Sequence, residues 1–283
     1  MSDYTTNGKR RYSAPAAACS ADLLLALARS DSPLSIAQLS ERAGYTKSLV
    51  YRVLAELETR DYVSKLPDGG YSLGLAVVEL GGAFAASVPL MSSVRRVLRR
   101  LAELTDETVS LGMLQDDQVL YLMREEGARS VFAVSHVGKR LPANAVALGK
   151  ALLAERTDAE IRAVFADRLA SHPALAALTP NTLTSLDALL EDIALVRERG
   201  HSEEHGEAVT GRCCVAAAVP FAQQGIDNVA ISISMQEARF HPEREHILGV
   251  LLQARDQVAR EARGRAAMGQ APAPSEVVMG GLS

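Results

Sequence analysis

The sequence predicts an α+β protein with two domains joined by a helix. Three observations indicate this: short capped helices and a hairpin turn lie near the amino terminus, an apolar helical stretch follows, and period-two alternation appears only beyond residue 105. At 283 residues the chain can bury two separate cores. The predicted segments are a disordered arm at 1–15, a helical domain at 16–74, a linker helix at 75–88, a mixed domain at 89–263 and a disordered tail at 264–283.

The first domain is predicted to contain three helices. Residues 17–29 include consecutive leucines typical of a buried helix. Ser35 with Gln38 has the form of a capping box, so a second helix should begin there. Gly44 can adopt the left-handed conformation that ends a helix, and Thr46 can cap the next one. Two short helices separated by a tight turn result.

The third helix has one apolar face and one polar face. Its apolar residues recur at intervals of three and four and should face inward: Val50, Val53, Leu54 and Leu57. The outward side chains can reach phosphates, base edges or both. The predicted DNA contacts are Thr46, Lys47, Ser48, Tyr51 and Arg52.

A hairpin follows this helix. The runs 62–66 and 71–73 flank a Pro-Asp-Gly-Gly turn, and Asp-Gly is a strong hairpin signal. The order helix, turn, helix, hairpin is that of a winged helix-turn-helix, which lays its second helix in the major groove. The plainer alternative is a small helical domain whose amphipathic helix carries a few outward charges.

Composition limits how the chain could bind nucleic acid and where it could act. With a net charge of −4, DNA binding must rest on a few placed cations, with help from the basic arm at 9–11 or with that arm simply solvated. No leader sequence or long apolar run is present, which predicts a cytoplasmic protein. Three cysteines, two of them adjacent, do not suggest a disulfide framework.

The linker helix at 75–86 is rich in small and apolar residues and is predicted to pair with a second subunit. The alternative is a connector without a partner. In the next helix, from Pro89, the residues expected to be buried are Val94, Val97, Leu98, Leu101 and Leu104. Strands are expected at 108–114, 119–124, 130–137, 214–219 and 228–234, and helices at 145–155, 157–167, 185–199 and 242–263.

Two stretches of the second domain predict a ligand site. Small residues at the start of the helix near Ala147 let a ligand approach free backbone amides, a natural site for a carboxylate. They could equally serve only close helix packing. Period-two alternation sends the hydroxyls of Ser232 and Ser234 to one face of a strand.

Other residues of the second domain suggest different chemistry. The pattern His-Ser-Glu-Glu-His at 201–205 matches a zinc-protease motif, but glycines on both sides oppose the helix that the motif needs. A metal held by some of His201, Glu204, His205 and Cys214 is a minor alternative. Cys213 and Cys214 are expected on opposite strand faces rather than as an oxidant sensor. No phosphate loop, dinucleotide fingerprint or nucleophile elbow is present, so no cofactor is predicted.

Several motifs resemble those of a known family. The stretch 34–73, above all Ala-Gly-Tyr-Thr-Lys-Ser-Leu-Val-Tyr-Arg-Val-Leu at 43–54, resembles the N-terminal domain of the isocitrate lyase regulator (IclR) family of bacterial transcription regulators. The segment 141–151 resembles the family's loop-to-helix signature, which ends in Gly-Lys-Ala. From residue 200 onward, an acidic loop, a Gly, a Cys and a strand with alternating serines resemble its second signature.

The resemblance spans about residues 17–263 and implies a GAF-like antiparallel sheet with helices that binds an effector. It places Glu204 and Glu207 on acidic loop positions and Gly211 and Cys214 on the Gly and Cys. The residues that it implies for the effector pocket are Leu141, Ala147, Leu148, Glu204, Cys214, Ser232 and Ser234. Cys213 stands where the family usually has Arg, and Asn144 where it often has His, so the resemblance does not fix the effector.

The expected function is therefore that of a DNA-binding transcription regulator controlled by a small organic acid. Its expected partners are double-stranded operator DNA, the acid and further copies of the chain, as a homodimer or a dimer of dimers. The alternative is a small-acid-binding or metal-dependent enzyme that uses the second domain. That reading requires a general base near Cys214, and no histidine is positioned by sequence to be one.

Overall fold

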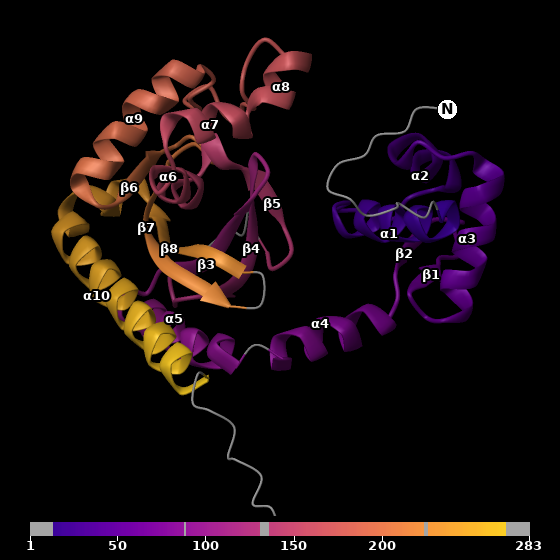
Figure 1. Cartoon of the computed structure of the whole chain (residues 1–283), viewed down its shortest axis with the longest axis horizontal. Coiled ribbons are helices and arrows are strands. Elements are labelled where there is room, and N and C mark those ends of the chain that lie inside the picture. The colour runs from indigo at the N-terminus through magenta and orange to yellow at the C-terminus, as the bar shows by residue number, and fades with distance from the viewer. Residues whose placement is uncertain (1–13, 88, 131–135, 224–225, 270–283) are drawn as a thin grey trace, which may run out of the picture. The chain divides into compact units, whose positions relative to one another are not determined.

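The structure is a computed structural model that describes residues 14–87, 89–130, 136–223 and 226–269. The chain divides into two compact units, Met1–Ser87 and Val88–Ser283 (Figure 1). Most of the predicted arm and tail lies outside the described residues. Where they are described, one helix begins at Pro15 and another continues to Gly269.

The first unit is built from helices and a small hairpin. Its described elements are α1 (Pro15–Ala28), α2 (Ile36–Ala43), α3 (Lys47–Thr59), β1 (Val63–Lys65), β2 (Tyr71–Leu73) and α4 (Ala76–Ser87). Both halves of the capping box between Ser35 and Gln38 are present, as predicted. Gly44 ends α2 with a φ of 73°, and the Thr46 hydroxyl accepts a hydrogen bond from the Leu49 amide. The winged helix-turn-helix is confirmed.

One core holds the first three helices and the wing together. It contains all four apolar residues predicted to face inward from α3, together with Cys19, Leu23, Leu27, Leu34, Leu39, Val63 and Tyr71. The wing strands pair antiparallel, with Val63 opposite Leu73, and Leu34 forms a bridge to Tyr71. This arrangement fixes α3 on the unit and leaves its polar face free.

The second unit is organised around a six-stranded antiparallel sheet with the order β5-β4-β3-β8-β7-β6. The strands are β3 (Thr108–Gln115), β4 (Gln118–Glu125), β5 (Arg140–Pro142), β6 (Ser202–His205), β7 (Arg212–Gln223) and β8 (Ile226–Gln236). The helices and one 3-10 turn are α5 (Pro89–Thr105), η1 (Ala143–Ala145), α6 (Ala147–Ala154), α7 (Asp158–Val164), α8 (Ala166–Ser171), α9 (Leu186–Arg199) and α10 (Glu237–Gly269).

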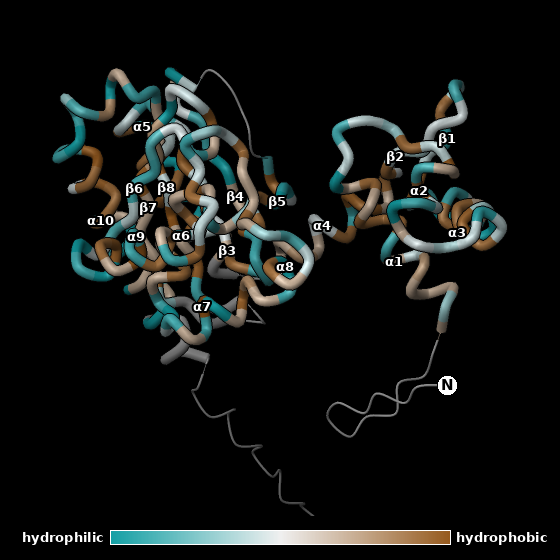
Figure 2. The backbone as a smooth tube through the Cα atoms, turned by 90° about the horizontal axis from the view of Figure 1, so that it is seen from above, coloured by the Kyte–Doolittle hydropathy of each residue, from teal (hydrophilic) through white to brown (hydrophobic). Residues whose placement is uncertain are grey.

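Helices cover both faces of this sheet, so it has two cores (Figure 1). Helices α5 and α10 pack on one face, and α6, α7 and α9 pack on the other. Hydrophobic stretches accordingly run through the strands and the helices that cover them (Figure 2). Cys213 belongs to the first core and Cys214 packs against the second, so the prediction that they face opposite ways is confirmed.

Four predicted details of the second unit were wrong. Leu104 is 49% exposed because it lies on the outer side of α5. The predicted helix at 157–167 is broken at Phe165 into α7 and α8. Helix α10 begins at Glu237 and contains Pro242 within its second turn. The predicted loop at 203–207 is partly the edge strand β6, which pairs with β7. The predicted strand at 130–137 falls largely outside the described residues.

Within the part of the chain that is described, no single helix is long and apolar enough to span a bilayer.

Candidate functional site

The polar face of α3 is the first candidate site. All five predicted DNA contacts are exposed, and the Tyr51 side chain is 59% exposed. Arg52 donates a hydrogen bond from Nε to the Ser48 carbonyl oxygen over 3.3 Å, which leaves its terminal nitrogens available for a partner. The face thus presents two cations and three hydroxyls on the helix that a winged helix-turn-helix places in the major groove.

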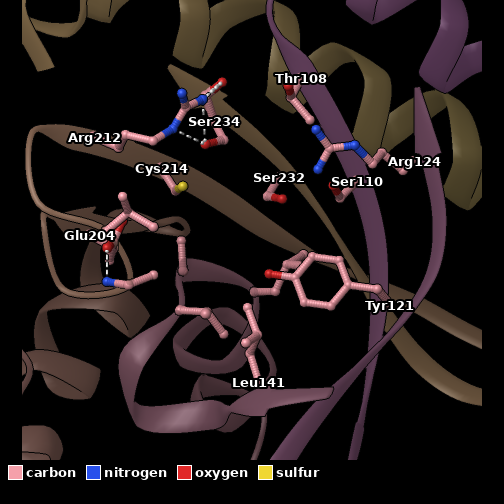
Figure 3. Close-up of a pocket in the computed structure, with 15 residues that line it drawn as sticks. Thr108, Ser110, Tyr121, Arg124, Leu141, Glu204, Arg212, Cys214, Ser232 and Ser234 are labelled. Atoms are coloured by element: carbon pink, nitrogen blue, oxygen red, sulfur yellow. Dashed lines mark hydrogen bonds between the residues drawn. The ribbon is translucent and has the colours of Figure 1, made fainter. Parts of the chain in front are cut away.

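The second candidate site is a cavity between the sheet and α6 (Figure 3). All seven residues that the sequence proposed for an effector site line it. The cavity has about 50 Å³ of space that water can reach. One water molecule needs roughly 10–15 Å³ of such space, so the cavity can hold a small ligand. The role of these residues remains a prediction.

Four hydroxyl groups form the sheet side of the cavity. Thr108 lies opposite Ser234 across the β3–β8 ladder, and Ser110 lies opposite Ser232. Each pair is two residues from the other on its strand, so all four side chains reach the same face of the sheet. The register therefore turns two separate alternating patterns into one polar surface.

Two guanidinium groups lie at the edge of this surface. Arg212 donates hydrogen bonds from its terminal nitrogen to the Ser234 hydroxyl and carbonyl oxygens over 3.2 and 3.3 Å. Arg124 extends from β4 and is fixed by an ion pair with Glu126 at 3.1 Å. The Tyr121 hydroxyl points toward the centre of the cavity (Figure 3). A guanidinium offers a forked set of donors that matches a carboxylate.

Glu204 enters the cavity from β6. Burial raises its pKa to about 7, against the lowering effect of the hydrogen bond that its Oε1 accepts from the Ala208 amide over 2.5 Å. Its other carboxylate oxygen is buried without a hydrogen-bond partner. Near neutral pH this group can therefore hold a proton and donate a hydrogen bond to a ligand. Burial also raises the pKa of the neighbouring Cys214 thiol well above its ordinary value, so this sulfur is a poor nucleophile.

The start of α6 closes the far side of the cavity. Ala147 and Leu148 line it, and the N-cap residue Val146 supplies no side-chain hydrogen bond to the first turn. Gly149 meets η1 so closely that a Cβ there would lie 2.1 Å from the Ala143 carbonyl oxygen. The Ser202 hydroxyl donates a hydrogen bond to the Ala147 carbonyl oxygen over 2.7 Å, which ties β6 to this helix start. Close packing and amides without a side-chain cap thus occur together.

Lys150, the second residue of the Gly-Lys-Ala run, is 1% exposed and anchors α6. Its ammonium group lies 2.6 Å from Glu207 and 2.9 Å from Asp192. A buried ammonium needs such partners, because an isolated one would be very costly. The triad therefore connects α6 to α9 and to the loop that carries Ala208 and Val209 into the cavity wall.

Several polar residues of the cavity were not predicted from the sequence. The missed polar residues are Thr108, Ser110, Tyr121, Arg124 and Arg212. The alternation of Thr108 and Ser110 could have indicated these two residues. The sequence does not show the register that brings them beside the serines of β8. Neither departure from the family pattern lies in the cavity wall: Cys213 faces α10, and the Asn144 amide donates to the carbonyl oxygens of Ala176 and Leu183.

The metal set considered from sequence does not assemble. Glu204 and Cys214 face the cavity, whereas the His205 ring nitrogen lies 3.2 Å from the Cys213 sulfur on the opposite face of the sheet. His201 contacts Glu203 instead, at 3.0 Å. The alternation of β6 separates these groups, and the strand also excludes the helical zinc-protease geometry.

Comparison with known proteins identifies both domains. The profile of the IclR helix-turn-helix domain matches residues 20–67, and that of the bacterial transcriptional regulator IclR C-terminal domain matches residues 83–260. The chain is 34% identical over 212 residues to the transcriptional regulator KdgR of Escherichia coli K12, covering 75% of this chain and 78% of KdgR. It is 28% identical to the transcriptional repressor IclR of the same strain, covering 81% and 83% of the two chains.

Solved structures give the same answer for the fold. The crystal structure of an IclR transcriptional regulator from Alicyclobacillus acidocaldarius matches with a TM-score of 0.75 at 27% identity and covers 89% of this chain and 100% of that one. The matched domains span both units, with the helix-turn-helix first and the effector-binding domain second. The chain therefore belongs to the IclR family of bacterial transcriptional regulators, in which a helix-turn-helix domain binds DNA and a C-terminal domain binds an effector.

Proposed function

We propose that this regulator reads its operator through Thr46, Lys47, Ser48, Tyr51 and Arg52, and that the cavity of the second unit binds a small organic acid. The convergence of two guanidinium groups, four hydroxyls and the start of α6 on one small cavity carries the second proposal. Each of these groups favours a carboxylate. The seven residues that the family resemblance implied for the effector pocket line this cavity, and they form the wall around the acid.

The chemistry of the cavity narrows the class of acid. Arg212 and Arg124 supply charge, and the hydroxyls of Ser110 and Ser232 supply further donors near them. Leu141 and Leu148 provide an apolar wall for the rest of the ligand. An IclR homologue from Microbacterium hydrocarbonoxydans, 21% identical and with a TM-score of 0.71, was crystallised with 4-hydroxybenzoate. That compound is a sensible member of a first test panel.

The regulator acts as a homodimer, and two such dimers can associate further. Support comes from the apolar residues that α4 and its preceding residue expose: Leu75, Val78, Leu80 and Phe84, each between 50% and 79% exposed. A helix with such a surface is stabilised when a second copy covers it. A dimer reads a site with two-fold symmetry, and the acid shifts the balance between two spacings of the recognition helices. We place this regulation in the cytoplasm.

The second unit is a binding domain and not an enzyme. No histidine is among the described residues that line the cavity, and the raised pKa of the Cys214 thiol opposes nucleophilic attack. A small acid should therefore be bound and released unchanged. Incubation of the protein with a bound acid, followed by chromatography of the acid, tests this directly.

The DNA proposal is tested by footprinting the purified protein on DNA upstream of its own gene and of neighbouring operons. We expect a protected site with inverted half-sites about one helical turn apart. Arg52→Ala should weaken operator affinity about tenfold or more, since a bidentate base contact contributes roughly 1–3 kcal/mol. Arg60→Ala, at the C-cap of the same helix, is the matched control. Equal affinities of the two variants would refute the assignment of this face.

The effector proposal is tested by titrating a panel of small carboxylic acids, with the matching amides as controls, into the full-length protein. An acid that binds should raise the thermal midpoint, whereas its neutral amide should not. Binding of amides and acids alike would remove the role given to the guanidinium groups.

A further inference from the structure

A second cluster of chemically active side chains lies on the face of the sheet opposite the effector cavity. His205 and Cys213 are direct neighbours across the β6–β7 ladder, and Glu237 begins α10 just beyond the end of β8. The His205 Nδ1 and Cys213 Sγ atoms are 3.2 Å apart. One donor atom from each of the three residues lies within 4.8 Å of the other two.

We propose that His205, Cys213 and Glu237 form a binding site for a divalent transition metal of the Zn²⁺ class. Imidazole, thiolate and carboxylate are the ligands that Zn²⁺ takes in proteins, at about 2.0–2.3 Å. Ligands of a tetrahedral ion at those lengths stand roughly 3–4 Å apart. The three ligand atoms now lie within 4.8 Å of one another, and a small movement of the exposed Glu237 side chain would bring its carboxylate to the shorter distance.

The surroundings of His205 match those of a metal ligand. Its Nε2 lies 3.4 Å from the Glu203 carboxylate, and in the tautomer that donates its proton there the Nδ1 lone pair is directed toward Cys213. Metal-bound histidines commonly donate their second ring nitrogen to a carboxylate in this manner. Glu203 is itself held by His201 and by an ion pair with Arg244, which keep its pKa far below the usual range. Phe240 packs edge-on against the imidazole ring at 5.4 Å.

The other two ligands are also held in place. Cys213 is the second residue of the long strand β7 and is fully buried, so it forms the floor of the site. The Glu237 amide donates a hydrogen bond to the Gly211 carbonyl oxygen over 3.0 Å, which fixes the first turn of α10 beside β7. His241 follows Glu237 by one helical turn, and its ring stacks on that of His205 with centroids 6.3 Å apart. It can supply a fourth ligand, or water can.

A bound metal would connect the sheet edge to α10. Without the metal, burial and the neighbouring Glu237 raise the pKa of the Cys213 thiol to about 12, and binding replaces its proton by the ion. Glu204 sits between Glu203 and His205 on β6 and points into the effector cavity. Occupation of the metal site therefore holds in place the strand that supplies one wall of that cavity.

Titration of the chelator-treated, reduced full-length protein with Co²⁺, followed by Zn²⁺ competition, tests the site. We expect one ion per chain and a thiolate-to-cobalt charge-transfer band in the near ultraviolet. Cys213→Ser should abolish the band. Cys214→Ser, which removes the adjacent thiol on the opposite strand face, should keep it. Absence of saturable one-to-one binding, or a band that survives in Cys213→Ser, would overturn the proposal.

Because Cys213 is buried, its variant could fail to fold, so two surface variants provide independent readouts. Glu237→Gln keeps the shape of an exposed side chain and should weaken Co²⁺ binding at least tenfold. Glu245→Gln, two turns further along α10, is the matched control and should bind like the unmodified chain. Metal-free unfolding curves identify any variant that is misfolded. Equal Co²⁺ affinity of the two glutamine variants would remove Glu237 from the site and defeat the three-ligand assignment.

Discussion

The two faces of strands β3, β7 and β8 have opposite characters although they alternate residue by residue. Toward α5 and α10 the strands present Val109, Leu111, Val215, Ile231 and Ile233, all fully buried. Toward α6 they present Thr108, Ser110, Cys214, Ser232 and Ser234 around a cavity. The same backbone thus carries a packed core on one side and a ligand site on the other. Period-two geometry lets each face change without altering the other.

The helices that cover these two faces, α10 and α6, also differ in how they are held in place. Helix α10 covers its face with apolar side chains such as Phe240, Ile247 and Leu251. Helix α6 is also buried, but it holds its position partly through charge, because Lys150 pairs with Asp192 and Glu207. We therefore expect substitutions on the α10 face to change stability, and those on the α6 face to change ligand binding except where they break this triad.

The largest effect is expected for Lys150→Met. Removal of one member of a buried ion pair leaves the others uncompensated, and such changes cost about 3–5 kcal/mol. Urea unfolding should show this loss, whereas Lys65→Met, at an exposed position, should change the free energy of unfolding little. The double variant Lys150→Met with Glu207→Gln should recover part of the loss, since the unpaired carboxylate is then absent. A single variant as stable as the unmodified chain would contradict the structural role given to the triad.

A smaller difference separates two neighbours on β8. Ile233→Ala removes buried methyl groups from the α10 face and should lower the free energy of unfolding by about 2–5 kcal/mol. Ser232→Ala, on the cavity face, should cost about 0.5–1.5 kcal/mol at most and should weaken acid binding instead. Unfolding curves and calorimetric titration of both variants distinguish these outcomes. A weaker acid affinity in Ile233→Ala that equals the loss in Ser232→Ala would show that the two faces are coupled.

Local chemistry explains which parts of this comparison were predictable from the sequence. The Ser35 capping box, the Gly44 helix end and the inward stripe of α3 each depend on residues within one or two turns, and all three are confirmed. The alternation of Ser232 and Ser234 likewise predicted correctly that their side chains share one face of β8. Local sequence patterns were sufficient to predict an interaction wherever both partner residues lie close together in the chain.

The rest depends on pairings between distant strands. The convergence of Arg124 and Arg212 on one cavity follows from the order β4-β3-β8-β7, which no local pattern specifies. The charged run at 203–205 looked like a loop, because the strand that pairs with it lies outside the run and its glutamates also bond beyond their neighbours. One of them, Glu203, pairs with Arg244 in α10, 41 residues later. Lys150 was not recognised as buried for the same reason.

A further predicted effect concerns pH. The pKa of Glu204 is about 7 in the folded chain, well above its unfolded value of roughly 4.3. Between these values the folded state holds a proton that the unfolded state has lost, so this group's contribution to stability falls as pH rises from about 4.5 to about 7. Acid binding should weaken over the upper part of that range, because the ionised carboxylate repels an anion.

Glu204→Gln isolates this contribution. The difference in free energy of unfolding between the variant and the unmodified chain should change between pH 5 and 7.5 and level off above that. The variant's affinity for an acid should vary less with pH than that of the unmodified chain. Parallel pH profiles for the two proteins would show that Glu204 does not carry the proton assigned to it.

The central claim is that occupation of the cavity by an acid controls DNA binding. Its most direct test is the operator affinity of the full-length protein with and without a bound acid, compared between the unmodified chain and Arg212→Ala. We predict that the acid changes the affinity of the unmodified chain several-fold. Arg212→Ala should bind operator normally without acid and should lose the response at the same acid concentration. An undiminished response in Arg212→Ala would contradict the assignment of the cavity as the effector site.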